Sequence, residues 1–304
     1  MTVRAWAELL RVSALFTVPG DALAGAAAVG RRPNRSTALA VGASLCLYEA
    51  GMALNDWADR DEDAVDRPHR PIPSGRITPR AALTAAGALT AAGLALAARA
   101  GRPALTVATG LAATVWAYDL RLKHTPAGPA AMAAARGLDL FLGATATATA
   151  PATAPATPAR AAVPAALPAA ALLTAHTYAV TAVSRHEARG GSTTAPLAAL
   201  TAVAALGGAA MRERPGEGKR ATAPARLLLT ALTGTYLRTA GRPLVHAALN
   251  PSPPLTQRAV GSGIRAMIPL QAALAARAGA SGTALAVMGL VPLARSLARK
   301  VSPT

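Results

Sequence analysis

The chain has 304 residues, of which 52% are hydrophobic and only 15% are charged, and its mean hydropathy is +0.33. This composition is too apolar and too poor in charge for an ordinary soluble domain of this length, so it indicates a membrane protein. The net charge of +17 comes mainly from arginines scattered at the ends of apolar runs, where they can reach lipid head groups, and this pattern excludes nucleic acid as a partner.

Ten apolar runs follow one another along the chain, and a helix that crosses a bilayer needs about 20 such residues. The runs are rich in Ala and Leu and do not alternate with polar residues, so they predict helices and not a membrane β-barrel. The last four are short, which leaves open that one of them is a half-helix, and we expect nine or ten transmembrane helices. The sequence therefore predicts an all-α, polytopic membrane bundle that forms one domain over residues 1–304. The runs cover residues 9–30, 37–56, 80–99, 103–120, 128–149, 162–184, 195–211, 223–240, 259–278 and 281–297.

The segments between the runs say less about topology. The stretch Ala150 to Arg160 consists mostly of Pro, Ala and Thr and is expected to be a loop or a frayed helix end, because each proline removes a helix hydrogen bond. Basic residues lie at both ends of the predicted bundle, so the positive-inside bias is weak. Orientation therefore cannot be read from the charges alone.

An acidic cluster marks the end of the second run. Six of the fourteen acidic residues of the chain lie between Asp56 and Asp66. On a continuing helix, at about 100° per residue, Asp56, Asp59 and Asp63 would face the same side within roughly 60°. Three carboxylates this close need a cation, and hard oxygen ligands favour Mg²⁺. We therefore predict a metal site at these three residues. Asp61, Glu62 and Asp66 are expected to be solvated instead.

The residues around this cluster suit a diphosphate. Asn55 adds an amide that can bond a phosphate oxygen or orient a carboxylate. The cluster is followed by Arg67-Pro68-His69-Arg70-Pro71-Ile72-Pro73-Ser74-Gly75-Arg76, in which three prolines prevent regular helix and hold basic side chains beside the acids. A metal on carboxylates next to arginines is typical of a diphosphate clamp.

These residues resemble the first signature of the UbiA prenyltransferase superfamily, Asn-Asp-x-x-Asp-x-x-x-Asp followed by Arg-Pro-Ile-x-Ser-Gly. Here the two parts are Asn55 to Asp63 and Arg70 to Gly75. Tyr118, Leu122 and Lys123 resemble the family's Tyr-x-x-x-Leu-Lys element, and Pro19 and Gly25 also suit its pattern. The resemblance implies a multi-pass helical bundle in the cell membrane around a central cavity, capped by Asp-rich loops on the cytoplasmic side.

The resemblance also implies an activity. Such enzymes use Mg²⁺ to transfer an isoprenyl group from a polyprenyl diphosphate to a small acceptor, which is aromatic or lipophilic. Carried over to this sequence, Asn55, Asp56, Asp59 and Asp63 hold metal and diphosphate, and Arg70 and Lys123 contact phosphate. Tyr118 orients a phosphate or shields the cation. The implied partners are these two substrates and membrane lipid, and the oligomeric state stays open.

A second Asp-rich stretch is expected after the sixth run, but the sequence there is Ser184-Arg185-His186-Glu187-Ala188-Arg189-Gly190-Gly191. Glu187 is its only acid, whereas Arg185 and Arg189 can contact the diphosphate directly. This variant is similar to that of the EboC-like branch of the superfamily. The alternative is therefore a catalytically impaired member that binds or moves an isoprenoid or a pathway product. An ion-coupled transporter is a third and weaker hypothesis.

Several polar residues lie inside the apolar runs. Arg136 and Asp139 are three residues apart in the fifth run and are expected to pair with each other, with cavity lining as the competing interpretation. Asp21, Glu49, His176 and Tyr178 are further candidates for facing the cavity. His176 is expected to be an interior side chain with satisfied hydrogen bonds and not a ligand.

Overall fold

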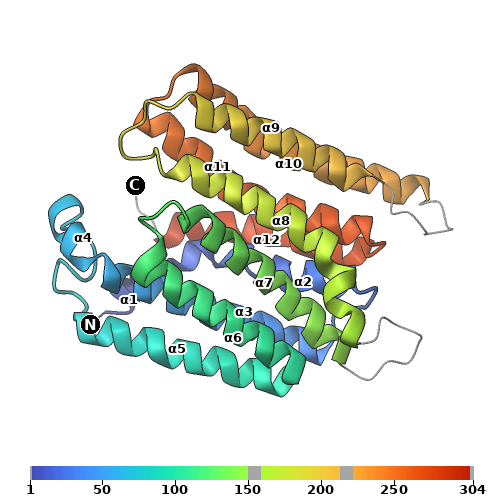
Figure 1. Ribbon diagram of the computed structural model, residues 1–304, viewed down its shortest axis with the longest axis horizontal. Coiled ribbons are helices and arrows are strands. Elements are labelled where there is room, and N and C mark those ends of the chain that lie inside the picture. The colour runs from blue at the N-terminus through green and yellow to red at the C-terminus, as the bar shows by residue number, and fades with distance from the viewer. Residues whose placement is uncertain (1, 150–158, 213–221, 302–304) are drawn as a thin grey trace.

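The computed structural model describes residues 2–149, 159–212 and 222–301, and this part of the chain is helical without a strand (Figure 1). Three short elements are not α-helical: η1 (Val12–Thr17) and η3 (Ala159–Ala161) are 3₁₀-helices, and η2 (Tyr118–Leu122) is a π-helix. Most of the predicted loop at Ala150 to Arg160 lies outside the described residues. The α-helices are α1 (Val3–Leu9), α2 (Pro19–Ala28), α3 (Arg35–Ala58), α4 (Arg60–Asp66), α5 (Pro79–Ala100), α6 (Arg102–Ala117), α7 (Gly128–Thr149), α8 (Ala162–Ser184), α9 (Thr194–Met211), α10 (Ala223–Leu249), α11 (Pro253–Arg277) and α12 (Ser281–Val301).

The first predicted span is not one helix. The chain breaks at Arg11, whose backbone is left-handed (φ 49°, ψ 47°), and η1 then leads into α2, which begins at Pro19. A left-handed residue cannot continue a right-handed helix, so α1 and α2 are separate elements. Hydropathy alone missed this break because the residues on both sides of it are apolar.

The final helices are longer than their apolar runs. α10 continues past Arg242 and through Pro243 to Leu249, and α11 begins at Pro253, six residues before the predicted start. Proline is favoured in the first turn of a helix, where its missing N–H has no intrahelical partner. The prediction of short elements was therefore wrong for α10 and α11, because polar residues end an apolar run without ending the helix, whereas α9 keeps its predicted length.

Within the described residues, five helices are long and apolar enough to cross a membrane by length and composition: α3, α5, α8, α9 and α11. Two shorter apolar helical stretches add to them: Leu15–Ala28, which includes α2, and Ser281–Pro292, which is the first part of α12. These spans support a polytopic membrane protein, as the sequence predicted. α3 begins with a capping box in which Asn34 and Thr37 bond each other's backbone N–H, at 3.1 and 3.0 Å.

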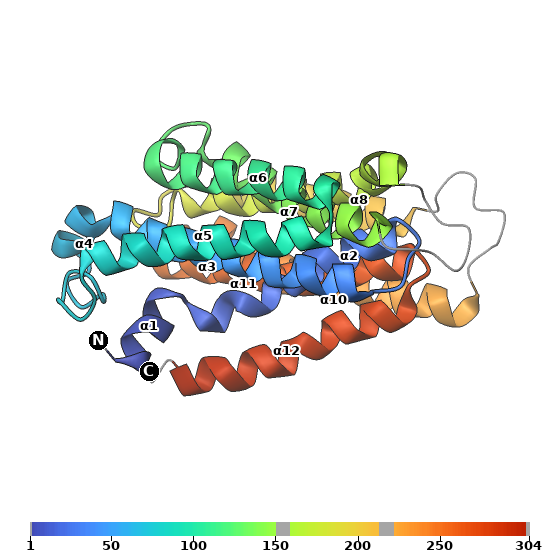
Figure 2. The same ribbon diagram turned by 90° about the horizontal axis from the view of Figure 1, so that it is seen from below.

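α2 lies at the centre of the bundle. Its buried alanines belong to three separate hydrophobic clusters, formed with α7 to α11, with α3 and α5 to α7, and with α10 to α12. The long helices run side by side along the longest dimension of the molecule, while α4, α1 and the end of α12 lie at one common end (Figures 1 and 2). Residues at the ends of several helices therefore meet at this end.

Two glycines let α2 and α7 approach each other through their backbones. A Cβ atom on Gly25 would lie 2.2 Å from the carbonyl oxygen of Leu140, and one on Gly143 would lie 2.3 Å from the Cα of Ala22. Lipid tails are as apolar as side chains, so membrane helices associate through close packing of small residues. This contact sets the position of α7 relative to the centre of the bundle.

His176 joins three helices within the bundle. Its side chain is fully buried, and its Nε2 lies 2.9 Å from the carbonyl oxygen of Gly263 on α11, to which it must donate. Nδ1 then accepts from the hydroxyl of Tyr236 on α10 at 3.1 Å. The expectation of a satisfied interior histidine is confirmed. Tyr178, by contrast, is 48% exposed.

A Tyr236→Phe variant is expected to lower stability by about 1–3 kcal/mol, because it leaves the buried Nδ1 of His176 without its donor. Thermal unfolding in detergent measures the effect. Tyr178→Phe is the matched control, since it removes the same hydroxyl from an exposed site and should leave the melting temperature unchanged. Equal melting temperatures for both variants would contradict a structural role for the His176 contact.

Candidate active site at the junction of α3 and α4

The Asp-rich segment is a bent helix and not a continuous one. α3 ends at Ala58, and Asp59 (φ −88°, ψ 4°) separates it from α4. The N–H of Asp59 still bonds the oxygen of Asn55, and the N–H of Asp63 still bonds the oxygen of Asp59, at 2.9 and 2.8 Å. The predicted single face of three aspartates is therefore split at its middle member.

Asp56 and Asp63 converge on one arginine. Both carboxylates are buried, with 5% and 2% exposure. Arg70 Nη1 donates to Asp63 Oδ2 at 2.7 Å and to Asp56 Oδ1 at 3.4 Å, so one guanidinium nitrogen lies between the two acids. Arg67 adds a second contact to Asp63, at 3.4 Å. The Arg-Pro-Ile loop thus places positive charge where the two acids meet.

Asp59 faces a different partner. Its Oδ1 forms an ion pair with Lys123, whose side chain is only 9% exposed, and lies 3.9 Å from Nε2 of His124. The π-helical turn η2 directs these residues, because the N–H of Lys123 bonds the oxygen of Tyr118 five residues earlier, at 3.0 Å. Such turns are rare and often occur at functional sites. The Tyr-x-x-x-Leu-Lys element therefore meets the acidic cluster through Asp59.

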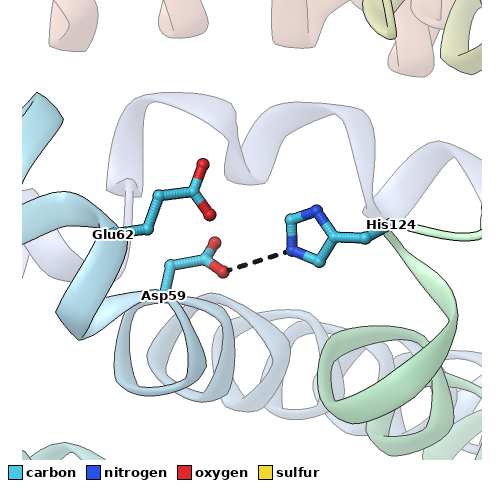
Figure 3. Close-up of side chains that lie close together, drawn as sticks. All are labelled: Asp59, Glu62 and His124. Carbon is cyan, nitrogen blue, oxygen red and sulfur yellow. Dashed lines mark ion pairs between the residues drawn. The ribbon is translucent and has the colours of Figure 1, made fainter.

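Glu62, Asp59 and His124 form a candidate metal group. Among the described residues, it is the one set of three His, Cys, Asp or Glu side chains whose ligand atoms all lie within 4.8 Å of one another. Figure 3 shows the two carboxylates and the imidazole turned toward a common point. The group is open to solvent, since Glu62 and His124 are exposed. The predicted set of Asp56, Asp59 and Asp63 does not converge as closely in this structure.

Two residues of the site were missed by the sequence interpretation. Asp119, which is 5% exposed, accepts a hydrogen bond from Asn55 Nδ2 at 3.2 Å. Arg11 Nη2 donates to Asp56 Oδ1 at 3.1 Å and to Asn55 Oδ1 at 3.4 Å. An acid beside Tyr118 in an acid-poor chain was the available signal for Asp119. No local pattern points to Arg11, because it lies 45 residues from its partner.

The second stretch lies beside the first. Arg185 is exposed, and its Nη1 donates to the carbonyl oxygen of Thr125, two residues after Lys123, at 2.9 Å. Burial raises the pKa of the Glu187 carboxyl above its ordinary value, and the nearby Arg67 opposes that rise. Arg189 is exposed in the same turn. The structure therefore brings Arg185 and Glu187 to the Asp-rich end of the bundle.

A cavity of about 210 Å³ opens beneath the acidic cluster. Polar side chains line both of its ends, and apolar residues such as Leu47, Leu111 and Val115 line the part between. Its outer end carries Arg11, Asn55, Tyr118 and Asp119, and its inner end carries Ser44, Tyr48, Arg136 and Asp139. The predicted pair of Arg136 with Asp139 was wrong, because Arg136 instead forms an ion pair with Asp21, at 2.5 Å. The competing interpretation, cavity lining, holds for both residues.

The donors of the site fit a hard divalent cation. Carboxylate and amide oxygens are the ligands that Mg²⁺ prefers, often together with phosphate oxygens. A cationic nitrogen already lies between Asp56 and Asp63, so their oxygens are arranged to hold positive charge. Asp59 and Glu62 offer a second position with His124.

Curated relatives match part of this chain. The digeranylgeranylglyceryl phosphate synthase of Methanopyrus kandleri is 35% identical over 129 residues, which make up 41% of this chain and 46% of that protein. The protein of the same name from Methanothrix thermoacetophila is 40% identical over 111 residues, or 36% of this chain and 42% of that protein. The matched segment thus spans less than half the length of either relative.

Solved structures match nearly the whole chain in fold. A UbiA homolog from Archaeoglobus fulgidus bound to GPP and Mg²⁺ superposes with a TM-score of 0.63 at 16% identity, covering 94% of this chain and 99% of that one. A structure of digeranylgeranylglyceryl phosphate synthase gives a TM-score of 0.61 at 16% identity, covering 91% and 98%. At this identity the likeness shows the fold.

Family membership follows from the sequence itself. The model of the UbiA prenyltransferase family matches residues 13–212, which is more than half of the chain and includes both the Asp-rich segment and the second stretch. With its apolar helices and its fold, the chain is a multi-pass membrane protein that belongs to the UbiA prenyltransferase family.

Proposed function

We propose that this protein is a Mg²⁺-dependent prenyltransferase that moves an isoprenyl group from a polyprenyl diphosphate to a hydroxyl group of a small lipophilic acceptor. The observation that carries the proposal is the convergence of Asp56 and Asp63 on a single cationic nitrogen beside a cavity inside a membrane bundle. A structural neighbour bound to GPP and Mg²⁺ supports the choice of donor substrate and metal.

The acceptor proposed here is an alcohol, whereas the sequence analysis expected an aromatic or lipophilic acceptor. The relatives are named for digeranylgeranylglyceryl phosphate, a product in which isoprenyl chains are carried by a glyceryl phosphate. That name supports an alcohol oxygen, and not an aromatic carbon, as the atom that is alkylated. The same names contain geranylgeranyl groups, so geranylgeranyl diphosphate is the first donor substrate to test.

In this proposal Asp56, Asp59 and Asp63 hold the metal, and Asn55 orients the diphosphate. When bound, Mg²⁺ would stabilise the negative charge that develops on the leaving diphosphate. Arg70 and Lys123 contact phosphate oxygens, since both already lie against the acids that the metal would use. Tyr118 lines the cavity beside this point and orients a phosphate or shields the allylic cation.

The reaction balances without a further reagent. The bond between the allylic carbon and the diphosphate oxygen breaks, and its electron pair leaves with the diphosphate. A lone pair of the acceptor hydroxyl forms the new carbon–oxygen bond, and the hydroxyl proton passes to a nearby base or to water. Positive groups placed where charge develops on the leaving group lower the barrier.

Arg185, Glu187 and Arg189 complete the diphosphate site. The hydrogen bond to Thr125 places Arg185 near Lys123. Glu187 lies close enough to Arg67 for an electrostatic interaction between the two side chains. Arginine binds phosphate through a fixed fork of donors, so Arg185 and Arg189 supply positive charge that a second metal would otherwise provide. We place this end of the bundle in the cytoplasm, and the assignment to the EboC-like branch stays a prediction.

Metal removal tests the proposal. Purified protein in nanodiscs should release pyrophosphate from geranylgeranyl diphosphate with geranylgeranylglyceryl phosphate as acceptor. EDTA should reduce the rate to background, and added MgCl₂ should restore it, because the diphosphate leaving group needs a cation. 4-Hydroxybenzoate serves as the aromatic comparison. An undiminished rate in EDTA would contradict the metal assignment.

A second candidate function rests on the single acid of the second stretch, Glu187. A protein with too few carboxylates for efficient catalysis would bind an isoprenoid or a pathway product without transferring it. Mg²⁺-dependent binding of geranylgeranyl diphosphate without pyrophosphate release, across alcohol and aromatic acceptors, would favour this function over transfer.

A further inference from the structure

Four exposed arginines lie on the outer side of α10 and α11 and take no part in lining the cavity. They are Arg238 and Arg242 of α10 and Arg258 and Arg265 of α11. Residues four or seven positions apart share one face of a helix, so each pair marks a single face. α10 runs beside α9 and α11 along one edge of the bundle (Figure 1). We call these four side chains the arginine face.

The orientation of the arginine face follows from contacts in the interior. Tyr236 and Gly263 both contact His176, so α10 and α11 are at the same level near these two residues. Arg238 and Arg265 each follow two residues later, and two residues rotate a helix by about 200°. Both side chains therefore leave their helices on the side opposite His176.

Two of the four arginines lie deep in the membrane. Arg238 is eleven residues before the end of α10, and Arg265 is twelve residues after the start of α11. At 1.5 Å per residue these separations are about 16 and 18 Å, and the hydrocarbon core of a bilayer is about 30 Å thick. Arg238 and Arg265 thus lie near its middle, whereas Arg242 and Arg258 lie closer to the surface.

No acidic residue of helices α8 to α12 offsets this charge. The sequence contains no Asp or Glu from Gly218 to Thr304, a segment that includes α10, α11 and α12, and α8 and α9 contain none either. Arg265 donates to the hydroxyl of Ser262 at 2.8 Å, and this acceptor is neutral. Asp21 of α2 is already paired with Arg136. The arginine face therefore carries net positive charge.

Depth decides which kind of partner fits this charge. An arginine exposed to lipid at mid-membrane depth is costly, and such residues normally meet groups of opposite charge. Arg242 and Arg258 lie close enough to the surface for their long side chains to extend to lipid head groups. Arg238 and Arg265 are too deep for that. A carboxylate on a helix at the same depth can accept two parallel hydrogen bonds from a guanidinium group, so the deep pair favours a protein partner over a lipid.

We propose that the arginine face is the docking site for a transmembrane helix of a partner protein that carries carboxylate side chains at mid-membrane depth. The surface beside the arginines suits this contact. Gly234 of α10 is exposed, and a Cβ atom there would meet nothing within 4 Å. Small residues let membrane helices approach each other closely. The docking site goes beyond the proposed transfer reaction, because none of its four arginines lines the cavity.

Two synthetic peptides test the docking site. Each is a membrane span of about 24 Leu and Ala residues, long enough to cross a bilayer. Two central residues, four positions apart, are Glu in one peptide and Gln in the other. Binding to the full chain in phosphatidylcholine vesicles is measured by fluorescence energy transfer between labelled protein and labelled peptide. The Glu peptide should bind at least about tenfold more tightly than the Gln peptide.

A double variant, Arg238→Gln with Arg265→Gln, should remove most of this preference, because it removes the two deep cations. Arg99→Gln with Arg212→Gln is the matched control, since both arginines are exposed at helix ends, and it should leave the preference within about twofold. Thermal unfolding establishes that both proteins are folded. If the double variant does not fold, Arg238→Gln alone carries the test and should reduce the preference by at least about threefold.

Equal affinities of the two peptides for the wild-type protein would overturn the docking site, as would equal losses in the double variant and in its control. Vesicles that contain phosphatidylglycerol test a lipid head group as the occupant. If this anionic lipid abolishes the preference of the wild type for the Glu peptide, a lipid occupies the face and the proposal fails. A preference that persists in these vesicles supports the helix. None of these measurements needs turnover.

Discussion

An Asp63→Asn variant is expected to lose pyrophosphate release by about 10²–10³-fold, the loss found when one group that supports developing charge is removed from a reaction site. Asp63 is 2% exposed and accepts from Arg70 at 2.7 Å and from Arg67 at 3.4 Å. An amide keeps the shape but cannot balance a divalent cation or two guanidinium groups. Initial rates at saturating Mg²⁺ and geranylgeranyl diphosphate measure the effect.

Asp66→Asn is the control for this loss. Asp66 lies on the same short helix, α4, but it is exposed, so its neutralisation should leave the rate within about twofold. Size-exclusion chromatography and thermal unfolding establish that both variants are folded. A folded Asp63→Asn protein that keeps more than a tenth of the wild-type rate would show that the buried pair of acids does not hold the metal.

A Gly143→Ala variant is expected to destabilise the bundle by about 3 kcal/mol or more, because the added carbon overfills a backbone contact. The new Cβ would lie 2.3 Å from the Cα and 2.4 Å from the oxygen of Ala22, closer than real Cβ atoms approach other atoms. α2 and α7 must then separate. That movement would also pull Arg136 away from Asp21. Monodisperse yield and melting temperature in detergent report the loss.

Gly87→Ala is the control for this loss of stability, because the same substitution at this site is not expected to destabilise the bundle. A Cβ on Gly87 of α5 meets nothing within 4 Å, and alanine favours a helix over glycine by about 1 kcal/mol. This variant should therefore be as stable as the wild type or more so. A Gly143→Ala protein that melts at the temperature of Gly87→Ala would rule out the close crossing of α2 and α7.

The sequence predicted the elements whose limits are set by local chemistry. α3, α5, α7 and α8 match their apolar runs within about two residues. Capping residues such as Asn34 and Thr78-Pro79 stand at the start of α3 and α5, so the helix and the apolar run begin at nearly the same position. It failed where the backbone departs from a helix without a change of polarity, as at Arg11, and where a helix continues through polar residues, as in α10.

The site was predicted in its residues more than in its contacts. The spacing of Asp56, Asp59 and Asp63 predicted that these three residues form the site. Because the helix bends at Asp59, however, Asp56 and Asp63 contact Arg70, whereas Asp59 contacts Lys123. Arg136 was assigned to its helix neighbour because residues three apart are adjacent on a helix surface. Its actual partner, Asp21, lies 115 residues away. Such partners depend on the crossing of α2 and α7, which small residues permit but do not specify.

The bond from Gln271 to Asp21 joins residues that are 250 positions apart. α2 is synthesised long before α11, which supplies the amide that completes the hydrogen bonding of its buried carboxylate. A chain shortened before Gln271 would therefore leave one oxygen of Asp21 without its donor at the centre of the bundle, while the other oxygen would keep its ion pair with Arg136.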